Sequence, residues 1–387
     1  MGTNFECLVV HSTELDSQFA AVDILEKCER QLGNRVPQAG ILYAGIDSDH
    51  QMLLERIMEK WPNLHLIGAT TDGELSSVMG YQDDSIVLTL LISEKNQIVS
   101  GFVDNTSSDF YRACNYALTA AARKLNGEPK LCVLLSDVLR INAETVVDQF
   151  SRASGYRIPI VGGMAADSWR FDEALQFHQK IASADISPFL LFSGPLDFSF
   201  GMDSGWEPYG DTGTITRSSG NVIYEINHKP ALQFYQDILG PEAKPTLELP
   251  IAIHDSEGKF RFMRTSFENF NSETGAVTYL GNVPEDHRVQ ITMVSRESIL
   301  SGAARAMEKA VQRFPGNYTP SLALCFSCSA RRVLLGTRTG EEYEGVKAQL
   351  DSSTQLAGFY TYGEICPHTH ESFNEFHNET FVAVLLG

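Results

Sequence analysis

Short uninterrupted apolar runs recur along the chain, and between them apolar residues return at helical spacing. Runs such as SIVLTLLIS (85–93) and TFVAVLLG (380–387) do not alternate with polar residues, which predicts strands covered on both faces. A helix is expected after Ser295, which is placed as its N-cap. Its predicted apolar face comprises Ile299, Leu300, Ala303, Met307, Ala310, Val311 and Phe314. The pattern predicts an α/β fold of mixed sheets with helices packed outside.

The same order of elements occurs three times: a strand, a helix, a strand, a second helix, a Gly-centred loop and a closing strand. The loops are LHLIGATTDGELSS (64–77), IPIVGGMAADSWRF (158–171) and TQLAGFYTYGEICP (354–367). Aligned on their first Gly, the first and third share the pattern G-x-x-T-x-G-E. The middle loop keeps only that Gly and small residues. We therefore expect three related units, each beginning with a strand and a helix.

An insertion precedes the third unit. Apolar and polar residues alternate in GKFRFMRT (258–265) and GAVTYLG (275–281), and PALQFYQDIL (230–239) has helical spacing. These segments predict antiparallel strands with one helix. We expect an N-terminal domain over 1–205 that contains two units, and a C-terminal domain over 206–387. The latter would contain the insertion (206–287) and the third unit (288–387), whose first strand is assigned to VQITM.

The composition narrows the class of partner. A net charge of −19 disfavours nucleic acid and anionic membranes, since both are negatively charged. No apolar run reaches the roughly 20 residues of a membrane span, and the N-terminus lacks the features of a signal peptide. The seven scattered cysteines are expected to be reduced, buried thiols. A cytoplasmic protein is therefore expected.

Several motifs together resemble the FIST family of bacterial sensory domains. They are GATTDGE, VGGMAAD, Gly205-Trp206, FSCSARRVLLG (326–336), GFYTYGEICP (358–367) and FHNET (376–380). The resemblance spans about 37–387 and implies sensing of amino acids or other small molecules. A chain of this length, with no segment left over for an output domain, is similar to the haem-binding, nitric-oxide-sensing branch. That likeness implies a gas ligand and a separate histidine kinase or cyclic-di-GMP enzyme as partner; homodimerisation stays open.

Haem requires an axial ligand in an apolar pocket. His228 is the first candidate, because it lies in a turn before the expected helix where FIST chains have a small residue. The alternative is a solvated turn histidine. Cys366, followed by Pro367, is a reserve candidate, with His368 or His370 as a second ligand. The alternative for this pair is a structural strand exit.

The Gly loops are the other candidate site, because loops at the ends of strands in α/β sheets commonly bind small molecules. Arg331 or Arg332 could hold an anionic group there. The alternatives are a turn held by its own Glu and a salt bridge within the protein. The predicted ligand-binding residues are Gly68, Thr71, Gly73, Glu74, Gly358, Tyr360, Thr361, Gly363, Glu364 and Arg331.

Enzyme activity has little support in the sequence. The chain contains neither a G-x-S-x-G nor an H-E-x-x-H motif. Cys325 and Cys328 form a CxxC pair at the end of an expected strand, where no helix N-terminus lowers a thiol pKa. Glu74 and Glu364 could act as an acid–base pair if their loops face one another. We expect a binding protein, with an enzyme using these two glutamates as the alternative.

Overall fold

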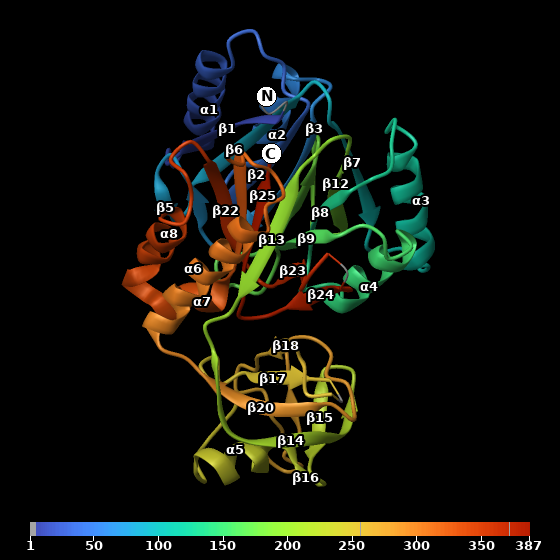
Figure 1. Cartoon of the computed structure of the whole chain (residues 1–387), viewed down its shortest axis with the longest axis vertical. Coiled ribbons are helices and arrows are strands. Elements are labelled where there is room, and N and C mark those ends of the chain that lie inside the picture. The colour runs from blue at the N-terminus through green and yellow to red at the C-terminus, as the bar shows by residue number, and fades with distance from the viewer. Residues whose placement is uncertain (1–4, 256, 371) are drawn as a thin grey trace.

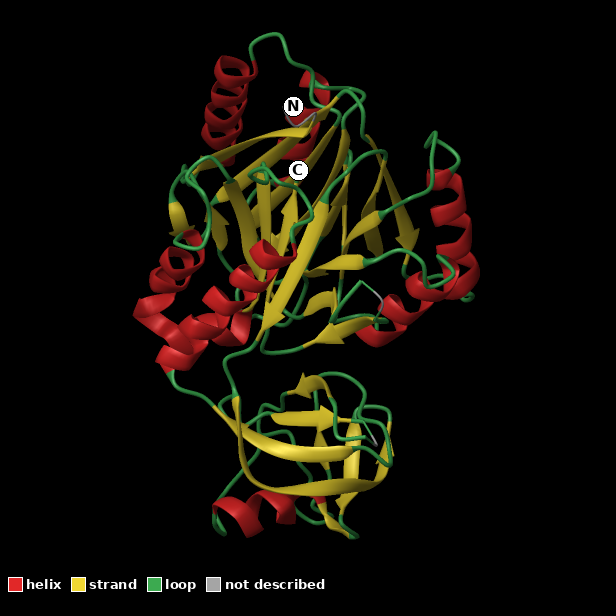
Figure 2. Ribbon diagram, viewed as in Figure 1, coloured by secondary structure: helices red, strands yellow, loops and turns green. Residues whose placement is uncertain are grey.

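The uninterrupted apolar runs form strands that are buried on both faces, as their pattern predicts. The computed structural model describes residues 5–255, 257–370 and 372–387. An α/β body carries a smaller β domain at one end (Figures 1 and 2). No helix in these ranges is long and apolar enough to cross a membrane. The predicted mixed α/β fold class is confirmed.

The α/β body contains three units with the same order of elements. The first unit comprises β1 (Phe5–Ser12), α1 (Ser17–Leu32), β2 (Ala39–Gly45), α2 (His50–Lys60), β3 (His65–Thr71), β4 (Glu74–Ser76), β5 (Gly80–Gln82) and β6 (Ile86–Ser93). The second comprises β7 (Gln97–Asp104), α3 (Phe110–Ala122), β8 (Leu131–Ser136), α4 (Ala143–Ala153), β9 (Ile160–Met164), β10 (Gln176–His178), β11 (Ile181–Ser183) and β12 (Ile186–Ser193).

The third unit is interrupted by the insertion after its first strand. It comprises β13 (Phe198–Asp203), α6 (Arg296–Arg313), β21 (Leu322–Cys328), α7 (Ser329–Leu335), a 3-10 turn (Gly336–Arg338), α8 (Thr339–Lys347), β22 (Gln355–Thr361), β23 (Glu364–Pro367), β24 (Asn374–His377) and β25 (Phe381–Leu386). Ser295 caps α6 as predicted, accepting a hydrogen bond from the Ser298 N–H at 3.1 Å. Val311, expected on the apolar face of this helix, is instead exposed.

Each unit lends a hairpin to the sheet of another unit. The three six-stranded sheets have the orders β1-β6-β2-β3-β10-β11, β7-β12-β8-β9-β23-β24 and β13-β25-β21-β22-β4-β5. Thus β10–β11 completes the first sheet, β23–β24 the second and β4–β5 the third. Because the exchange is cyclic, no unit can leave the body without breaking strand pairs in two sheets.

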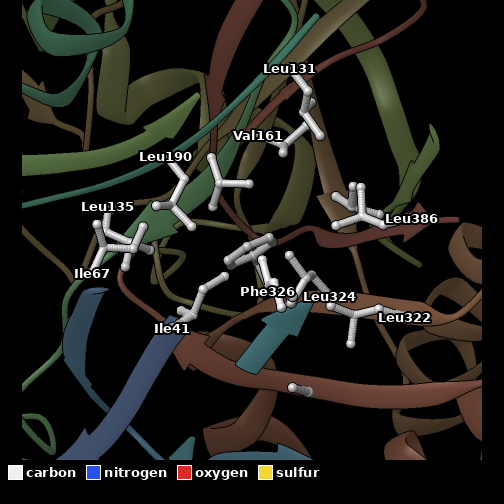
Figure 3. Close-up of a cluster of buried hydrophobic side chains, with 14 of the residues drawn as sticks. Ile41, Ile67, Leu131, Leu135, Val161, Leu190, Leu322, Leu324, Phe326 and Leu386 are labelled. Carbon is white, nitrogen blue, oxygen red and sulfur yellow. The ribbon is translucent and has the colours of Figure 1, made fainter. Parts of the chain in front are cut away.

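The three sheets turn their inner faces toward a common apolar core. Figure 3 shows side chains from all three units meeting there, including Ile41, Val161 and Phe326. The outer faces are covered by helices: α1 and α2 on the first sheet, α3 and α4 on the second, and α6 and α8 on the third (Figure 1). This arrangement explains why the strands are apolar on both faces.

The insertion forms a β domain with its own apolar core. It comprises β14 (Glu207–Ser219), β15 (Val222–Ile226), β16 (Lys229–Pro230), α5 (Ala231–Leu239), β17 (Ile251–His254), β18 (Phe260–Arg264), β19 (Val277–Thr278) and β20 (Arg288–Met293). The strand VQITM, assigned from the sequence to the third unit, lies here as β20 between β14 and β17. The first strand of the third unit is β13, which pairs with β25. An apolar run predicts a strand but not the sheet it joins, and this explains the difference.

Candidate functional site

The first glycine of each Gly loop occupies an equivalent place in its sheet. Gly68, Gly162 and Gly358 lie in β3, β9 and β22, each opposite a residue of the parallel neighbouring strand. A Cβ at any of the three would collide with the carbonyl oxygen of that opposite residue. The strand register therefore confirms the alignment of the three loops. It also gives these glycines a structural role, since only Gly permits so close an approach.

Two buried glutamates hold the first and third loops in place. Glu74 Oε2 accepts hydrogen bonds from the Ser85 N–H at 3.0 Å and the Ser85 hydroxyl at 2.5 Å, and its Oε1 accepts from the Thr71 hydroxyl. Glu364 Oε2 accepts from the Thr380 N–H at 3.0 Å and hydroxyl at 2.6 Å. Each carboxyl thus ties a loop to the start of the next long strand, β6 or β25.

The middle unit has an equivalent residue that the sequence comparison missed. Gln176 begins β10 and lies opposite Ala69, the residue after the first glycine of the first loop. Glu74 and Glu364 lie opposite the corresponding residues of the third and middle loops. It follows Gly162 by 14 positions, whereas the two glutamates follow their glycines by 6. The longer loop moves Gln176 out of the motif window. Only the topology could identify it.

Glu74 and Glu364 do not form a pair in the described structure. Glu74 lies in the third sheet and Glu364 in the second, and no hydrogen bond or electrostatic contact connects them. The carboxyl group that acts on Glu364 is that of Glu379. Burial raises the pKa of Glu74 to about 7, and burial together with Glu379 raises the pKa of Glu364 well above its usual range.

Arg331 lies within the protein, where all its donor nitrogens have protein partners. Its Nε and Nη2 donate to Glu342 Oε1 at 3.0 and 2.7 Å, and Nη2 also donates to the Ile299 carbonyl at 2.9 Å. Nη1 donates to the Ser204 carbonyl. The Tyr360 hydroxyl donates to Glu342 Oε2 at 2.7 Å. Arg331 and Tyr360, both predicted to contact ligand, belong to one buried network that joins α6, α7, α8 and β22.

The other predicted loop residues also contact protein groups. The Thr361 hydroxyl donates to two carbonyls, one of them that of Gly363 at 2.8 Å. Gly363 lies against the ring of Phe376, and Gly73, with φ 106°, lies against Tyr81. Of these residues, Thr361 also lines a cavity.

His228 lies on the surface of the β domain. Asn227 and His228 have φ of 53° and 61° and form the two-residue turn between β15 and β16. Two left-handed residues in sequence are typical of a type I′ hairpin turn. The His228 N–H donates to the Thr216 hydroxyl at 2.9 Å. The structure thus explains the residue as a turn residue on an exposed hairpin.

The described residues do not fit a haem site. His228 is exposed and lines none of the four cavities described. Cys366 is buried, and burial raises the pKa of its thiol, which disfavours the thiolate that iron requires. His368 Nε2 lies 2.6 Å from the Arg261 carbonyl. None of these three predicted ligands therefore offers haem a free axial donor.

A cavity of about 70 Å³ lies between the second unit, the third unit and the β domain. It is bordered by the middle Gly loop, by the junction where β21 passes directly into α7, and by the segment after β18. The lining residues are Val138, Leu139, Trp169, Phe171, Thr265, Phe267, Leu280, Cys328, Ser329, Ala330, Thr361, Tyr362 and Asn378. We call this space the aromatic cavity.

Four rings form the walls of the aromatic cavity. Trp169 meets Phe171 and Phe267 edge-on, with centroids 5.2 and 5.7 Å apart. Phe171 stacks on Tyr362 at 4.9 Å with an interplanar angle of 15°. Since Trp169 and Phe171 come from the second unit, Tyr362 from the third and Phe267 from the β domain, the rings join three parts of the chain.

One carboxylate shapes the loop that presents Trp169 and Phe171. Asp167 accepts hydrogen bonds from the N–H groups of Phe171, Asp172 and Glu173 at 3.0, 2.7 and 3.1 Å. The Tyr362 hydroxyl donates to Asp167 at 2.5 Å and accepts a hydrogen bond from the backbone N–H of Trp169 at 2.7 Å. Trp169 and Phe171 have left-handed φ values of 62° and 52°. Such conformations in non-Gly residues cluster at functional sites.

Several residues at the aromatic cavity have buried polar atoms that make no hydrogen bond of regular geometry in the described structure. These atoms are Trp169 Nε1, Ser329 Oγ, Asn378 Oδ1 and Thr265 Oγ1 on its lining, and Asp72 Oδ2 of the first unit beside it. Ser329 and Trp169 are near enough to Asp72 to lower its pKa, but too far or misaligned for a regular hydrogen bond. Burial outweighs these effects and that of Arg332, and raises the pKa of Asp72 to about 6.

Glu379 lies behind the aromatic cavity, in a left-handed conformation with φ 62°. It is fully buried, and its two carboxylate oxygens have no hydrogen bond of regular geometry. Burial raises its pKa to about 8, against the opposing effects of Thr265 and Arg331. Glu379 is therefore protonated in the folded protein at neutral pH.

This protonation predicts a loss of stability with rising pH. Because the folded-state pKa is above the usual value of a glutamate, the folded protein binds more protons than the unfolded chain between about pH 4.5 and 8. Glu379→Gln removes the carboxyl group, and with it the free-energy cost of keeping that group protonated in the folded protein. It should therefore raise the free energy of unfolding at pH 8 by at least about 1 kcal/mol. Urea unfolding at pH 5 and pH 8 measures it, with the exposed Glu59→Gln as control. Equal effects at both pH values would contradict the prediction.

Two protein-family models match the chain. The chain matches the FIST N domain family over 38–229 and the FIST C domain family over 231–367. It is 23% identical over 238 residues to an uncharacterized protein, MJ1623, of Methanocaldococcus jannaschii. That match covers 59% of this chain and 45% of the relative, so the chain spans less than half of the relative's length.

Two solved structures resemble the chain over 98% of both lengths. One is a chorismatase at 12% identity and TM-score 0.36, and the other a cyanuric acid hydrolase from A. caulinodans at 8% identity and the same TM-score. The two domain matches together cover most of the sequence, from 38 to 367. The chain therefore belongs to the FIST family, whose domains are sensory, ligand-binding domains of signal transduction.

Proposed function

We propose that this FIST protein senses a small molecule that carries a protonated amine, such as an amino acid, bound in the aromatic cavity. The observation that carries the proposal is the combination of four aromatic walls with buried polar atoms that make no hydrogen bond of regular geometry within the described part of the chain. Buried polar atoms are normally hydrogen-bonded, and a ligand is one way to satisfy them.

The side chains at the cavity favour a cationic ligand, because they combine aromatic rings with hydrogen-bond acceptors. The ring faces of Trp169 and Tyr362 can hold an ammonium group by cation–π attraction. Asp72 Oδ2 and Asn378 Oδ1 supply acceptors for its N–H groups, and Ser329 and Trp169 Nε1 can donate to a carboxylate. A buried water needs roughly 10–15 Å³, so the cavity holds on the order of five non-hydrogen atoms. The α-amino end of an amino acid has this size.

Ligand binding would be transmitted through the position of the β domain. Phe267, Thr265 and Leu280 of that domain line the cavity opposite Trp169 and Tyr362 of the body. A ligand that contacts both sides favours the arrangement in which they are close. The family resemblance also implies a signalling partner that would read this change. A histidine kinase or a cyclic-di-GMP enzyme is the class that the family resemblance implies.

A thermal-shift screen tests the chemical class of the ligand. Amino acids, simple amines, carboxylic acids and N-acetylated amino acids are compared at equal concentration. Binding to the folded state raises its stability by mass action, so an amine at 100 times its Kd adds about 2.7 kcal/mol. We expect the midpoint to rise with at least one free amine and not with its N-acetyl derivative. A rise with N-acetyl derivatives or carboxylic acids alone would contradict the proposal.

A further inference from the structure

Three potential metal ligands meet where the β23–β24 hairpin faces the β domain. His368 follows β23, and Glu375 and His377 lie in β24. Each of the three offers one ligand atom, and these atoms lie within 4.8 Å of one another. No other group of three or more histidine, cysteine or acidic side chains in the described ranges meets this criterion. The cluster is separate from the aromatic cavity, whose lining includes none of the three.

His377 is oriented as metal-binding histidines are. Its ring is fully buried, and Nε2 donates to the Cys366 carbonyl at 2.8 Å. That hydrogen bond places the proton on Nε2 and leaves the lone pair on Nδ1, which has no hydrogen-bond partner. A backbone carbonyl that fixes one nitrogen of a histidine while the other binds the ion is the common arrangement in metal sites.

His368 and Glu375 complete the cluster. His368 Nε2 lies 3.0 Å from Glu375 Oε2 and 2.6 Å from the Arg261 carbonyl. The His368 and His377 rings are 5.4 Å apart and nearly perpendicular. His368 Nε2 donates to the Arg261 carbonyl, so an ion can bind between Nε2 and Glu375 Oε2 only when the ring carries its proton on Nδ1 and gives up that hydrogen bond. The Arg261 carbonyl is then a neighbouring oxygen donor.

We propose that His368, Glu375 and His377 form a binding site for a divalent transition-metal ion, with zinc as the ion to test first. Two imidazoles and one carboxylate are a donor set that suits zinc and iron(II), and leave a position for water. With bonds of about 2.0–2.1 Å, tetrahedral ligand atoms lie roughly 3.4 Å apart. The widest separation in the cluster therefore has to close by on the order of 1 Å.

The charges around the cluster set limits on its affinity. Arg261 Nε donates to the other oxygen of Glu375, Oε1, at 2.8 Å, and so orients the carboxylate without occupying Oε2. Arg264 is close enough to act on both Glu375 and His377, but its guanidinium is paired with Glu144 at 2.6 Å. Arg261 and Arg264 oppose a divalent ion, so we expect a lower affinity than the same three ligands would have without them.

The site has an entrance and a structural consequence. His368 lines a cavity of about 340 Å³ together with His254 and Phe260 of the β domain, and an ion can enter there. Arg261 belongs to β18 of the β domain and Glu375 to β24 of the body. Because all three ligands belong to the body, a bound ion would act on this contact through Glu375 and His368, which Arg261 also contacts.

Zinc titration of the full chain, first stripped of metal with a chelator, tests the proposal. We expect one equivalent to bind by calorimetry and to raise the thermal midpoint. His368→Ala and Glu375→Gln should each weaken binding at least 100-fold. His287→Ala removes a half-buried histidine of the β domain that lies outside the cluster and should leave the affinity unchanged.

Cobalt(II) gives a readout that does not depend on a variant folding. The wild-type protein should show visible d–d absorption of a low-coordinate site with one equivalent of cobalt, and zinc should abolish it. The proposal fails if the wild-type protein binds neither ion at one equivalent. It also fails if folded His368→Ala and Glu375→Gln bind zinc as tightly as the wild-type protein.

Discussion

Replacing Arg331 by methionine is expected to lower the free energy of unfolding by about 3–5 kcal/mol, because the change leaves a buried charge without its partner. Glu342 would lose both hydrogen bonds from the guanidinium, at 3.0 and 2.7 Å. The carbonyls of Ser204 and Ile299 would lose their donors as well. Because these carbonyls belong to the end of β13 and to α6, the loss should loosen the third unit.

Urea unfolding measures this effect, and two further variants sharpen it. Arg331→Met combined with Glu342→Leu removes both charges. The double variant should therefore lose less free energy of unfolding than the two single variants lose together. Arg35→Met breaks an exposed pair with Glu6 and should cost less than about 1 kcal/mol. A loss below about 1 kcal/mol for Arg331→Met, in a folded protein, would contradict the assigned role of the network.

Gly358→Ala is expected to lower the free energy of unfolding by about 3 kcal/mol, at the upper end of the range for overpacking. Its Cβ would collide with the carbonyl oxygen of Cys325 and lie 2.7 Å from the Cβ of that residue. The strain cannot be relieved by a side-chain rotation, because the obstacle is the backbone of the paired strand β21.

Gly345→Ala is the matched control for this substitution. Gly345 lies within α8, and a Cβ there meets nothing within 4 Å. Alanine is favoured over glycine in a helix by roughly 0.5–1 kcal/mol, so this variant should be slightly more stable than the wild-type protein. If both variants unfolded at the same urea concentration, the close approach of β21 and β22 would not be the reason that position 358 requires a glycine.

The sequence predicts the elements of the body well because each is encoded locally. The uninterrupted apolar runs of β6 and β25 and the cap at Ser295 depend only on neighbouring residues. The three loop glycines could be aligned because each meets the same backbone constraint. The cyclic exchange of hairpins is not encoded locally, since β4–β5 pairs with a strand about 280 residues later.

The candidate site was predicted less completely, also for physical reasons. Of the predicted ligand-binding residues in the Gly loops, Thr361 lines the aromatic cavity. The loop that carries Trp169 contributes none of the predicted residues, because it lacks the shared motif. Its shape depends on Asp167 and on Tyr362 from another unit. A bulky residue at His228 suggested a ligand, whereas a type I′ turn accounts for it.

Titration calorimetry with the most effective amine from the thermal-shift screen tests ligand binding in the aromatic cavity most directly. The wild-type protein should bind one equivalent, and Asp72→Asn and Trp169→Ala should each weaken binding at least 10-fold, because Trp169 lines the cavity and Asp72 is a carboxylate close to Trp169 and Ser329. Tyr116→Ala, which truncates a ring that is 77% exposed on α3, should bind as the wild-type protein does. Unchanged affinity in both folded cavity variants would contradict the account.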